Sequence, residues 1–245
     1  MGDCQYVLSN VHGYLHSFNQ LLGDWDSENE TLIVTGNIIN YGHNSFLVCK
    51  RLIELKQMYP DKVIFLKGKH EIFFETFYRN PSFYYEKFLE EGGLSTLLSF
   101  EREGISYEEM NDRYYMLNAV LPDIDFMELF GYLISANDSF ETESSVYFSY
   151  NKNLLDLSES AFSFDKKKLF LTTDEDPRFK VHYLNHYLPE YLSRNNSFSY
   201  GDLSLFKNNY VLLGKEPAGL TEASSYGHHI SNGIVIETTQ VFAQD

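Results

Sequence analysis

Polar side chains follow three apolar segments in the first third of the chain, and their types suit chemistry. Asn10 and His12 follow the first apolar segment, and Asn37 follows the second. Residues 68–71, which read Gly-Lys-His-Glu, follow the third. Imidazole, carboxylate and ammonium groups transfer protons, hold anions or bind metals. We therefore expect a functional site where these three segments end.

The three apolar segments, residues 5–9, 31–35 and 62–67, predict short buried β-strands. Between them, apolar residues recur at helical spacing in a short helix that ends at Leu22 and in a longer helix at residues 45–59. The order β-α-β-α-β predicts a parallel sheet with right-handed crossovers. The carboxyl ends of parallel strands lie at one edge of a sheet, so the polar residues that follow them are expected to converge.

The rest of the chain changes character after the third strand. Residues 72–121 predict a helical segment, in which Asn80-Pro81 and Gly92-Gly93 break the first part into two or three helices. Residues 151–180 are rich in Ser, Asp and Lys, and we interpret them as an insert or a lid. We expect a single domain that spans residues 1–245. Further strands are predicted at residues 130–135, 146–150, 199–206, 210–213, 233–238 and 240–244.

The composition of the chain limits the cellular location and the kinds of partner that we expect. Hydrophobic residues make up 43% of the 245 residues, which is enough for a sizeable core. The formal charge is 19 − 35 = −16, and so acidic a surface repels phosphate backbones, so we expect no nucleic-acid partner. No apolar run reaches about 18 residues, so no transmembrane helix or membrane partner is expected. Cys4 and Cys49 are interpreted as buried thiols in a reducing compartment, and the expected location is the cytoplasm.

Taken together, the polar strand ends resemble the motifs of the calcineurin-like metallophosphoesterases, and in particular of the bacterial PPP serine/threonine protein phosphatases. That family has D-x-H-G, G-D-x-x-D-R-G, G-N-H-E, a strand that ends in H-A-G or H-G-G, and G-H-T-P. The matching stretches, in the same order, are residues 10–13, 36–42, 68–71, 135–137 and 214–217. Residues 92–97 also resemble a G-G-x-x-T-L segment of the family. The resemblance implies a four-layer α/β fold, in which two mixed β-sheets form a sandwich flanked by helices.

The chain departs from the family at most positions where the resemblance implies a metal ligand. The replaced ligands fall at Asn10, Asn37, Lys69, Ser135 and Lys215. His12 is the only ligand type that is retained. Amide oxygens are weak ligands for divalent ions, and an ammonium group has no lone pair to offer. We therefore expect no metal cofactor; a dinuclear Mn or Fe/Zn centre is expected only if the chain is an active enzyme.

The resemblance also assigns an acid position, which falls on His70 and is followed by Glu71. In the family an Asp orients this His and an Arg holds phosphate; the matching residues here are Asn40 and Tyr41. A general acid without a metal-activated nucleophile achieves little. The sequence therefore predicts a pseudophosphatase, a non-catalytic protein that binds a protein partner or a phosphate-like anion. If no anion is bound, we expect the positive charge of the pocket lysines to be neutralised by an internal acidic residue such as Glu71 or Asp138.

Two other readings of the sequence stay open. The chain could be an active phosphoesterase, acting on phosphoproteins or small phosphoesters, with a rebuilt site or a single metal on His12 plus His70 or a late His. It could instead be a structural or oligomer-forming module. The dense Phe and Tyr residues at 73–88 are expected to pack as core, with an exposed patch as the alternative.

Overall fold

A computed structural model of the chain describes residues 3–104, 139–148, 168–172, 210–213, 224–232 and 234–242. The predicted helical segment is therefore described only as far as residue 104. Outside the described residues lie the predicted strands at 130–135 and 199–206, most of segment 151–180, and the candidates Ser135, Asp138 and Lys215.

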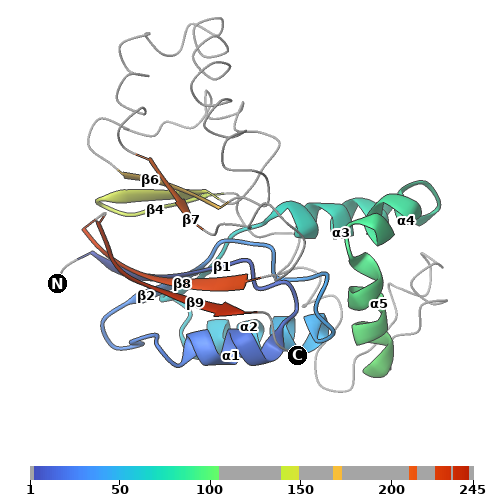
Figure 1. Cartoon of the computed structure of the whole chain (residues 1–245), viewed down its shortest axis with the longest axis horizontal. Helices are drawn as coiled ribbons and strands as arrows, with labels where there is room; N and C mark the ends of the chain where they lie inside the picture. The colour runs from blue at the N-terminus through green and yellow to red at the C-terminus, as the bar shows by residue number, and fades with distance from the viewer. Residues whose placement is uncertain are drawn as a thin grey trace, which may run out of the picture.

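The first sheet has five strands in the order β3-β2-β1-β8-β9. Its strands are β1 (Cys4–Ser9), β2 (Thr31–Val34), β3 (Val63–Phe65), β8 (Ser224–Ser231) and β9 (Ile234–Phe242). The first three pair in parallel, as predicted, whereas β8 and β9 join them in antiparallel orientation. The parallel strands consequently end at one edge of the sheet (Figure 1). The two predicted C-terminal strands are one, because β9 pairs with β8 along its whole length.

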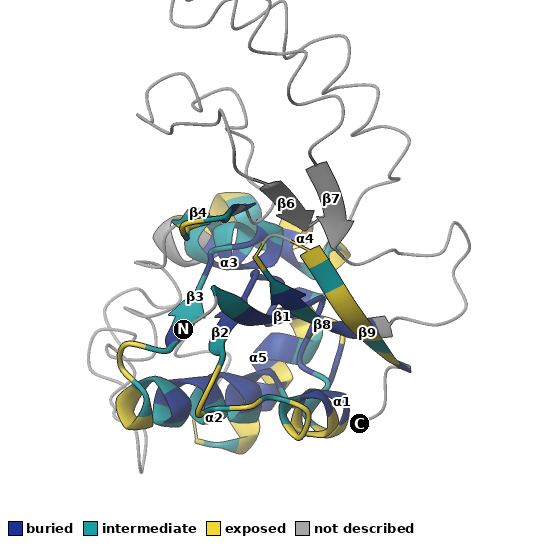
Figure 2. Cartoon of the chain, turned by 90° about the vertical axis from the view of Figure 1, so that its left-hand side faces the viewer, coloured by how far each residue is buried: buried dark blue, intermediate teal, exposed yellow. Residues whose placement is uncertain are grey.

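Two helices cover one face of this sheet (Figure 2). They are α1 (Leu15–Leu22) and α2 (Ser45–Met58), both close to the predicted bounds. Side chains along a strand alternate between its faces. Tyr6 and Leu8 of β1 therefore join the core beneath the helices with Phe18, while Val7 joins a second core on the opposite face. Full burial of each such side chain contributes about 2 kcal/mol.

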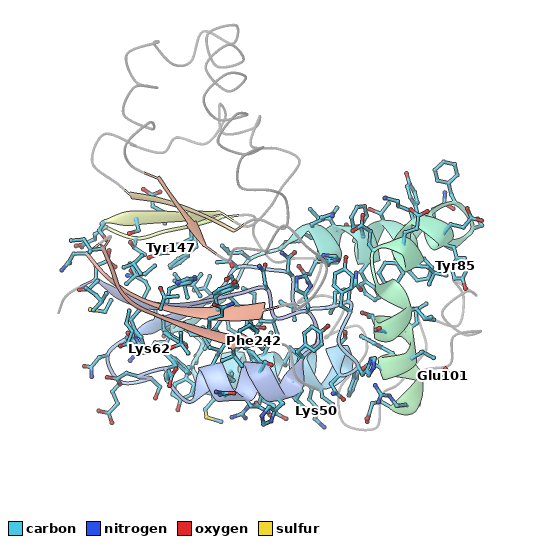
Figure 3. All side chains as sticks on the ribbon, in the orientation of Figure 1. Lys50, Lys62, Tyr85, Glu101, Tyr147 and Phe242 are labelled. Carbon is cyan, nitrogen blue, oxygen red and sulfur yellow. The ribbon has the colours of Figure 1, made fainter. Side chains whose placement is uncertain are left out.

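A second sheet packs on that opposite face (Figure 1). Its strands, in the order β4-β5-β6-β7, are β4 (Ser139–Glu141), β5 (Ser145–Phe148), β6 (Lys168–Thr172) and β7 (Tyr210–Leu213). Tyr147 lies between the sheets (Figure 3), where it packs with Val7 and Ile33 and donates a 2.8 Å hydrogen bond to Gln5 Oε1. Both sheets are mixed, so the predicted sandwich is confirmed. The predicted insert at 151–180 contributes a sheet strand, β6.

Three helices follow β3, and they break where the sequence predicts. They are α3 (Lys69–Arg79), α4 (Pro81–Glu90) and α5 (Gly93–Arg102). Pro81 suits the first turn of α4, where its missing N–H costs nothing, and Gly92 has the left-handed φ of 79° that glycine favours. Phe74, Phe77 and Phe88 are buried. The aromatic segment is thus mainly core, and Phe83, which is 75% exposed, is an exception.

The two cysteines differ in how deeply they are buried. Cys49 is buried under the first sheet, as predicted, but Cys4 is only half-buried because it begins β1 at the open end of the sheet. Within the part of the chain that the structure describes, no helix is both long and apolar enough to cross a membrane.

Gly227 of β8 leaves the space that the Tyr6 side chain occupies. A Cβ at position 227 would overlap the Tyr6 hydroxyl, which donates a 2.9 Å hydrogen bond to the Leu21 carbonyl. Gly227→Ala is therefore expected to lower the free energy of unfolding by about 2 kcal/mol, measured by urea denaturation. In a Tyr6→Phe background the overlap with the hydroxyl is gone, while the approach to the ring carbon Cζ, at 2.7 Å, remains, so the same change should cost less than in the unmodified protein. An equal cost in both backgrounds would contradict this explanation.

Candidate functional site

The polar strand ends do converge at the edge where β1, β2 and β3 finish. His12 N donates a 2.7 Å hydrogen bond to the carbonyl of Asn37, which ties the loop after β1 to the loop after β2. Asn37 Nδ2 donates to Asn10 Oδ1 at 3.2 Å. His70, in the first turn of α3, brings its ring to 4.9 Å from the His12 ring. The structure thus brings together four predicted site residues, all of them buried.

The backbone of this region is held in the left-handed conformation. Among the described residues, six other than glycine have positive φ, and five of them are Asn10, His12, Asn37, Asn40 and Tyr41, with φ between 49° and 74°. Asparagine adopts this region with little strain, whereas His12 and Tyr41 carry Cβ clashes. Such conformations cost about 1–3 kcal/mol each and persist only where surrounding contacts hold them.

Glu71 supplies those contacts. Its buried carboxylate accepts hydrogen bonds from the backbone N–H groups of Asn37 (2.9 Å), Ile38 (2.7 Å), Ile39 (3.3 Å) and Gly68 (2.8 Å). Burial raises the pKa of Glu71, and the four N–H groups act in the opposite direction. With its oxygens engaged in this way, the carboxylate fixes the loops after β2 and β3 and is not available as a metal ligand.

Lys69 has an acidic partner, but it is neither of the two that the sequence suggested. Lys69 Nζ pairs with Glu91 Oε2 at 3.0 Å and lies 5.6 Å from the centre of the Phe73 ring. Lys87 also pairs with Glu91, at 3.3 Å. Glu71 serves the backbone instead, and Asp138 lies outside the described residues. The Lys69 charge is therefore compensated by a residue at the end of α4.

Three rings form the centre of the site. The Tyr41 ring packs edge-on against His12 at 5.2 Å and His70 at 5.3 Å, and it is the exposed member, at 42%. Burial lowers the pKa of His12 to about 4, and the Lys69 charge acts in the same direction. The Ile39 carbonyl opposes this effect without reaching hydrogen-bond geometry. Burial likewise lowers the pKa of His70 well below its ordinary value, so both rings are neutral at pH 7.

Asn40 orients His70, as the resemblance implies for this position. Asn40 Nδ2 lies 2.9 Å from His70 Nδ1. Thr96 of α5 donates to Asn40 Oδ1 at 2.8 Å and accepts from Asn40 N at 2.9 Å. Sequence reasoning did not assign these roles to Thr96 or Glu91. Thr96 lies in the recognised 92–97 stretch, so the motif was the available signal for it; nothing in the pattern distinguished Glu91 from other surface acids.

Several polar atoms in the site lack partners among the described residues. They are Asn10 Nδ2 and both ring nitrogens of His12, all of them buried. A buried polar group left without a hydrogen bond costs about 1–3 kcal/mol, and such groups in native proteins usually contact ordered water, an ion or a ligand. These unpartnered atoms make the strand ends the candidate place for a small polar ligand.

The described donors do not fit the dinuclear metal centre that the resemblance to metallophosphoesterases implies. That centre needs a bridging carboxylate, and the bridging position is Asn37. The carboxylate beside the site, Glu71, is saturated by backbone N–H groups. Within the described ranges, no three His, Cys, Asp or Glu side chains are grouped so as to hold a metal ion. Among the ligand positions that the structure describes, His12 alone keeps a good ligand, and Asn10 and Asn37 offer only amides.

Comparisons with known proteins found similar solved structures but no similar sequence. No family model matches the sequence, and no curated protein matches it significantly. Similar solved structures include a serine/threonine phosphatase from Saccharomyces cerevisiae with similarity to human phosphatase PP5 (10% identity, 93% of this chain and 73% of that chain, TM-score 0.45). Others are a metallophosphoesterase from Sphaerobacter thermophilus (15%, 70% and 60%, 0.37) and a cold-active protein-tyrosine phosphatase of a psychrophilic Shewanella species (14%, 100% and 81%, 0.42). Each of these proteins is named as a phosphatase or phosphoesterase, and each matches with a TM-score below 0.5.

Proposed function

We propose that the protein is a non-catalytic relative of the PPP phosphatases, which uses the former active-site pocket to bind a phosphate-like anion presented by a partner protein or free in solution. One observation carries the proposal. The positions that would hold metal-bridging carboxylates are amides, and the remaining carboxylate, Glu71, is engaged by four backbone N–H groups. Without a metal-bound hydroxide, the pocket lacks a nucleophile.

The pocket keeps features that favour an anion. Asn10 Nδ2 and a protonated nitrogen of His12 are hydrogen-bond donors without partners among the described residues. Glu71, whose negative charge would repel an anion, has its oxygens turned to the backbone. The Lys69 ammonium is close enough to lower the pKa of His12, so it contributes positive potential. These groups can hold a phosphate-sized oxyanion without a metal.

Anion binding is tested by thermal unfolding. Inorganic phosphate or vanadate at about one hundred times Kd should stabilise the protein by about 2.7 kcal/mol, which raises Tm by several degrees. Sodium chloride at matched ionic strength controls for salt effects. Asn10→Ala and His12→Ala should abolish the shift, whereas Lys50→Ala on α2 should keep it. Failure of phosphate and vanadate to raise Tm would contradict the anion proposal.

Catalysis is tested separately, with p-nitrophenyl phosphate and Mn²⁺. We expect no turnover above that of a His12→Ala preparation. Lys69→Asn, which restores the family residue at that position, should not produce turnover, because Asn10 and Asn37 still carry no charge. Turnover by the Lys69→Asn variant would show that the amides suffice as ligands and would overturn the non-catalytic assignment.

A second candidate is a phosphoesterase with a single metal. The observation that favours it is the unpartnered His12 ring, 4.9 Å from the neutral His70 ring. Mn²⁺-dependent turnover that is lost in His12→Ala would support this candidate over the first. Metal analysis of the purified protein adds an independent readout, since a single-metal enzyme should retain about one equivalent.

A further inference from the structure

The hydrogen bond between Asn40 and His70 has a definite direction, which follows from the partners of both residues. Asn40 Nδ2 lies 2.9 Å from His70 Nδ1. Thr96 Oγ1 donates to Asn40 Oδ1 at 2.8 Å, so the NH₂ group of the amide is the end that faces the ring. An amide NH₂ group can only donate, so Nδ1 accepts this hydrogen bond and carries no proton.

The His70 ring holds one proton and not two. It is 1% exposed, and the charge of Lys69 and the ring of His12 lie beside it. Burial and a nearby positive charge both disfavour the imidazolium form. Because Nδ1 accepts a hydrogen bond from Asn40, the single proton of the neutral ring lies on Nε2.

Thr96 completes this network, because its hydroxyl acts as a donor on one side and as an acceptor on the other. Its hydroxyl donates to Asn40 Oδ1 at 2.8 Å and accepts from Asn40 N at 2.9 Å. Ser45 Oγ lies 3.1 Å from Thr96 Oγ1 and must be the donor there, because the one Thr96 hydrogen is already used. Each hydroxyl and amide group named in the network, and His70 Nδ1, then has a partner of the complementary kind.

We propose that Asn40, oriented by Thr96, is a positioning residue that fixes His70 as the neutral Nε2–H tautomer. A carboxylate at position 40 would do the opposite, since it only accepts hydrogen bonds and would require the proton on Nδ1. The assignment goes beyond the proposed function, because it concerns the ground state of one ring whether or not the protein hydrolyses phosphoesters.

Nitrogen NMR of the intact protein tests the tautomer directly. In a long-range ¹H–¹⁵N spectrum of ¹⁵N-labelled protein at neutral pH, His70 should show an unprotonated Nδ1 and a protonated Nε2. The His70 signals are the set that is missing from the His70→Gln spectrum; if that variant does not fold, they are the set that Asn40→Asp shifts. A protonated Nδ1 in the unmodified protein would overturn the proposal.

Substitutions separate the positioning role from a purely structural one. Asn40→Asp should move the proton to Nδ1, and an unchanged Nε2–H pattern would contradict the proposal. Thr96→Val removes the donor to Asn40 Oδ1, so both tautomers should become populated, whereas Thr96→Ser keeps the hydroxyl and should keep the single tautomer. Ser45→Ala is the matched control, because it contacts Thr96 without touching Asn40. A single Nε2–H tautomer in Thr96→Val would show that Thr96 does not orient the amide.

Discussion

Replacing Glu71 with alanine is expected to lower the free energy of unfolding by at least about 4 kcal/mol, the largest effect predicted for a single side chain here. The carboxylate accepts four backbone hydrogen bonds from two loops, and it is 1% exposed. Alanine would leave four N–H groups buried without partners, each at a cost of about 1–3 kcal/mol. The same loops contain residues in left-handed conformations, which these bonds help to hold. Urea denaturation followed by circular dichroism measures the loss.

Two further variants make the Glu71 result specific. Glu54→Ala removes an acid that pairs with Arg51 at 3.3 Å on the exposed side of α2, and it should cost less than about 0.5 kcal/mol. Glu71→Gln keeps the shape but turns an NH₂ group toward N–H donors, so an intermediate loss is expected. If Glu71→Ala lost no more stability than Glu54→Ala, the Glu71 carboxylate would not be what holds the loops after β2 and β3 in place.

Acidification from pH 6.5 to pH 4 is expected to destabilise the protein by about 3 kcal/mol through His12 alone. Burial lowers the pKa of His12 to about 4 in the folded protein, against an ordinary value near 6.5. Between these values the unfolded chain binds the proton and the folded protein does not. Stability therefore rises with pH across this window and is lost as the pH falls through it. Above pH 6.5 the group contributes no pH dependence.

The His12 contribution is isolated by comparing variants at the two ends of the window. His12→Asn and His12→Gln cannot titrate, so their loss of stability between pH 7 and pH 4 should be smaller than that of the unmodified protein by about 3 kcal/mol. Asparagine also suits the left-handed backbone at position 12 (φ 49°) better than glutamine does. Glu71 titrates in all three proteins and cancels in the comparison, whereas the pKa of His70 is less depressed without the His12 charge, which adds to the expected difference. Identical pH profiles would show that His12 is not a buried neutral histidine.

Much of the arrangement that positions the site could be predicted from the sequence. The parallel strands and the helix breaks at Asn80-Pro81 and Gly92-Gly93 depend on local features, namely apolar periodicity and the backbone limits of Pro and Gly. The convergence of Asn10, His12 and Asn37 follows from strand order alone, because parallel strands end at one edge. Their relation to Ser135 and Lys215 stays a prediction, since those two residues lie outside the described part of the chain.

The partners of the charged side chains could not be predicted in the same way. Lys69 pairs with Glu91, and Thr96 meets Asn40, because α4 and α5 fold back toward the strand ends. An acidic protein offers many carboxylates, and the sequence pattern does not say which lies within 4 Å of a given ammonium group. Glu71 was expected to face a lysine, yet it faces the backbone, where four donors outcompete one ammonium.

The sequence by itself determined which groups stand at the strand ends, and hence that amides replace the carboxylates a dinuclear metal centre requires. Only the tertiary structure decided which of those groups are already satisfied. Glu71 and Lys69 are occupied by the protein itself, and His70 Nδ1 is paired with Asn40, whereas Asn10 and His12 keep buried polar atoms to which no described residue makes a hydrogen bond. The type of a residue is read from a single position in the sequence. Whether its polar atoms find hydrogen-bond partners depends on segments tens of residues apart, which must come within about 3 Å of each other.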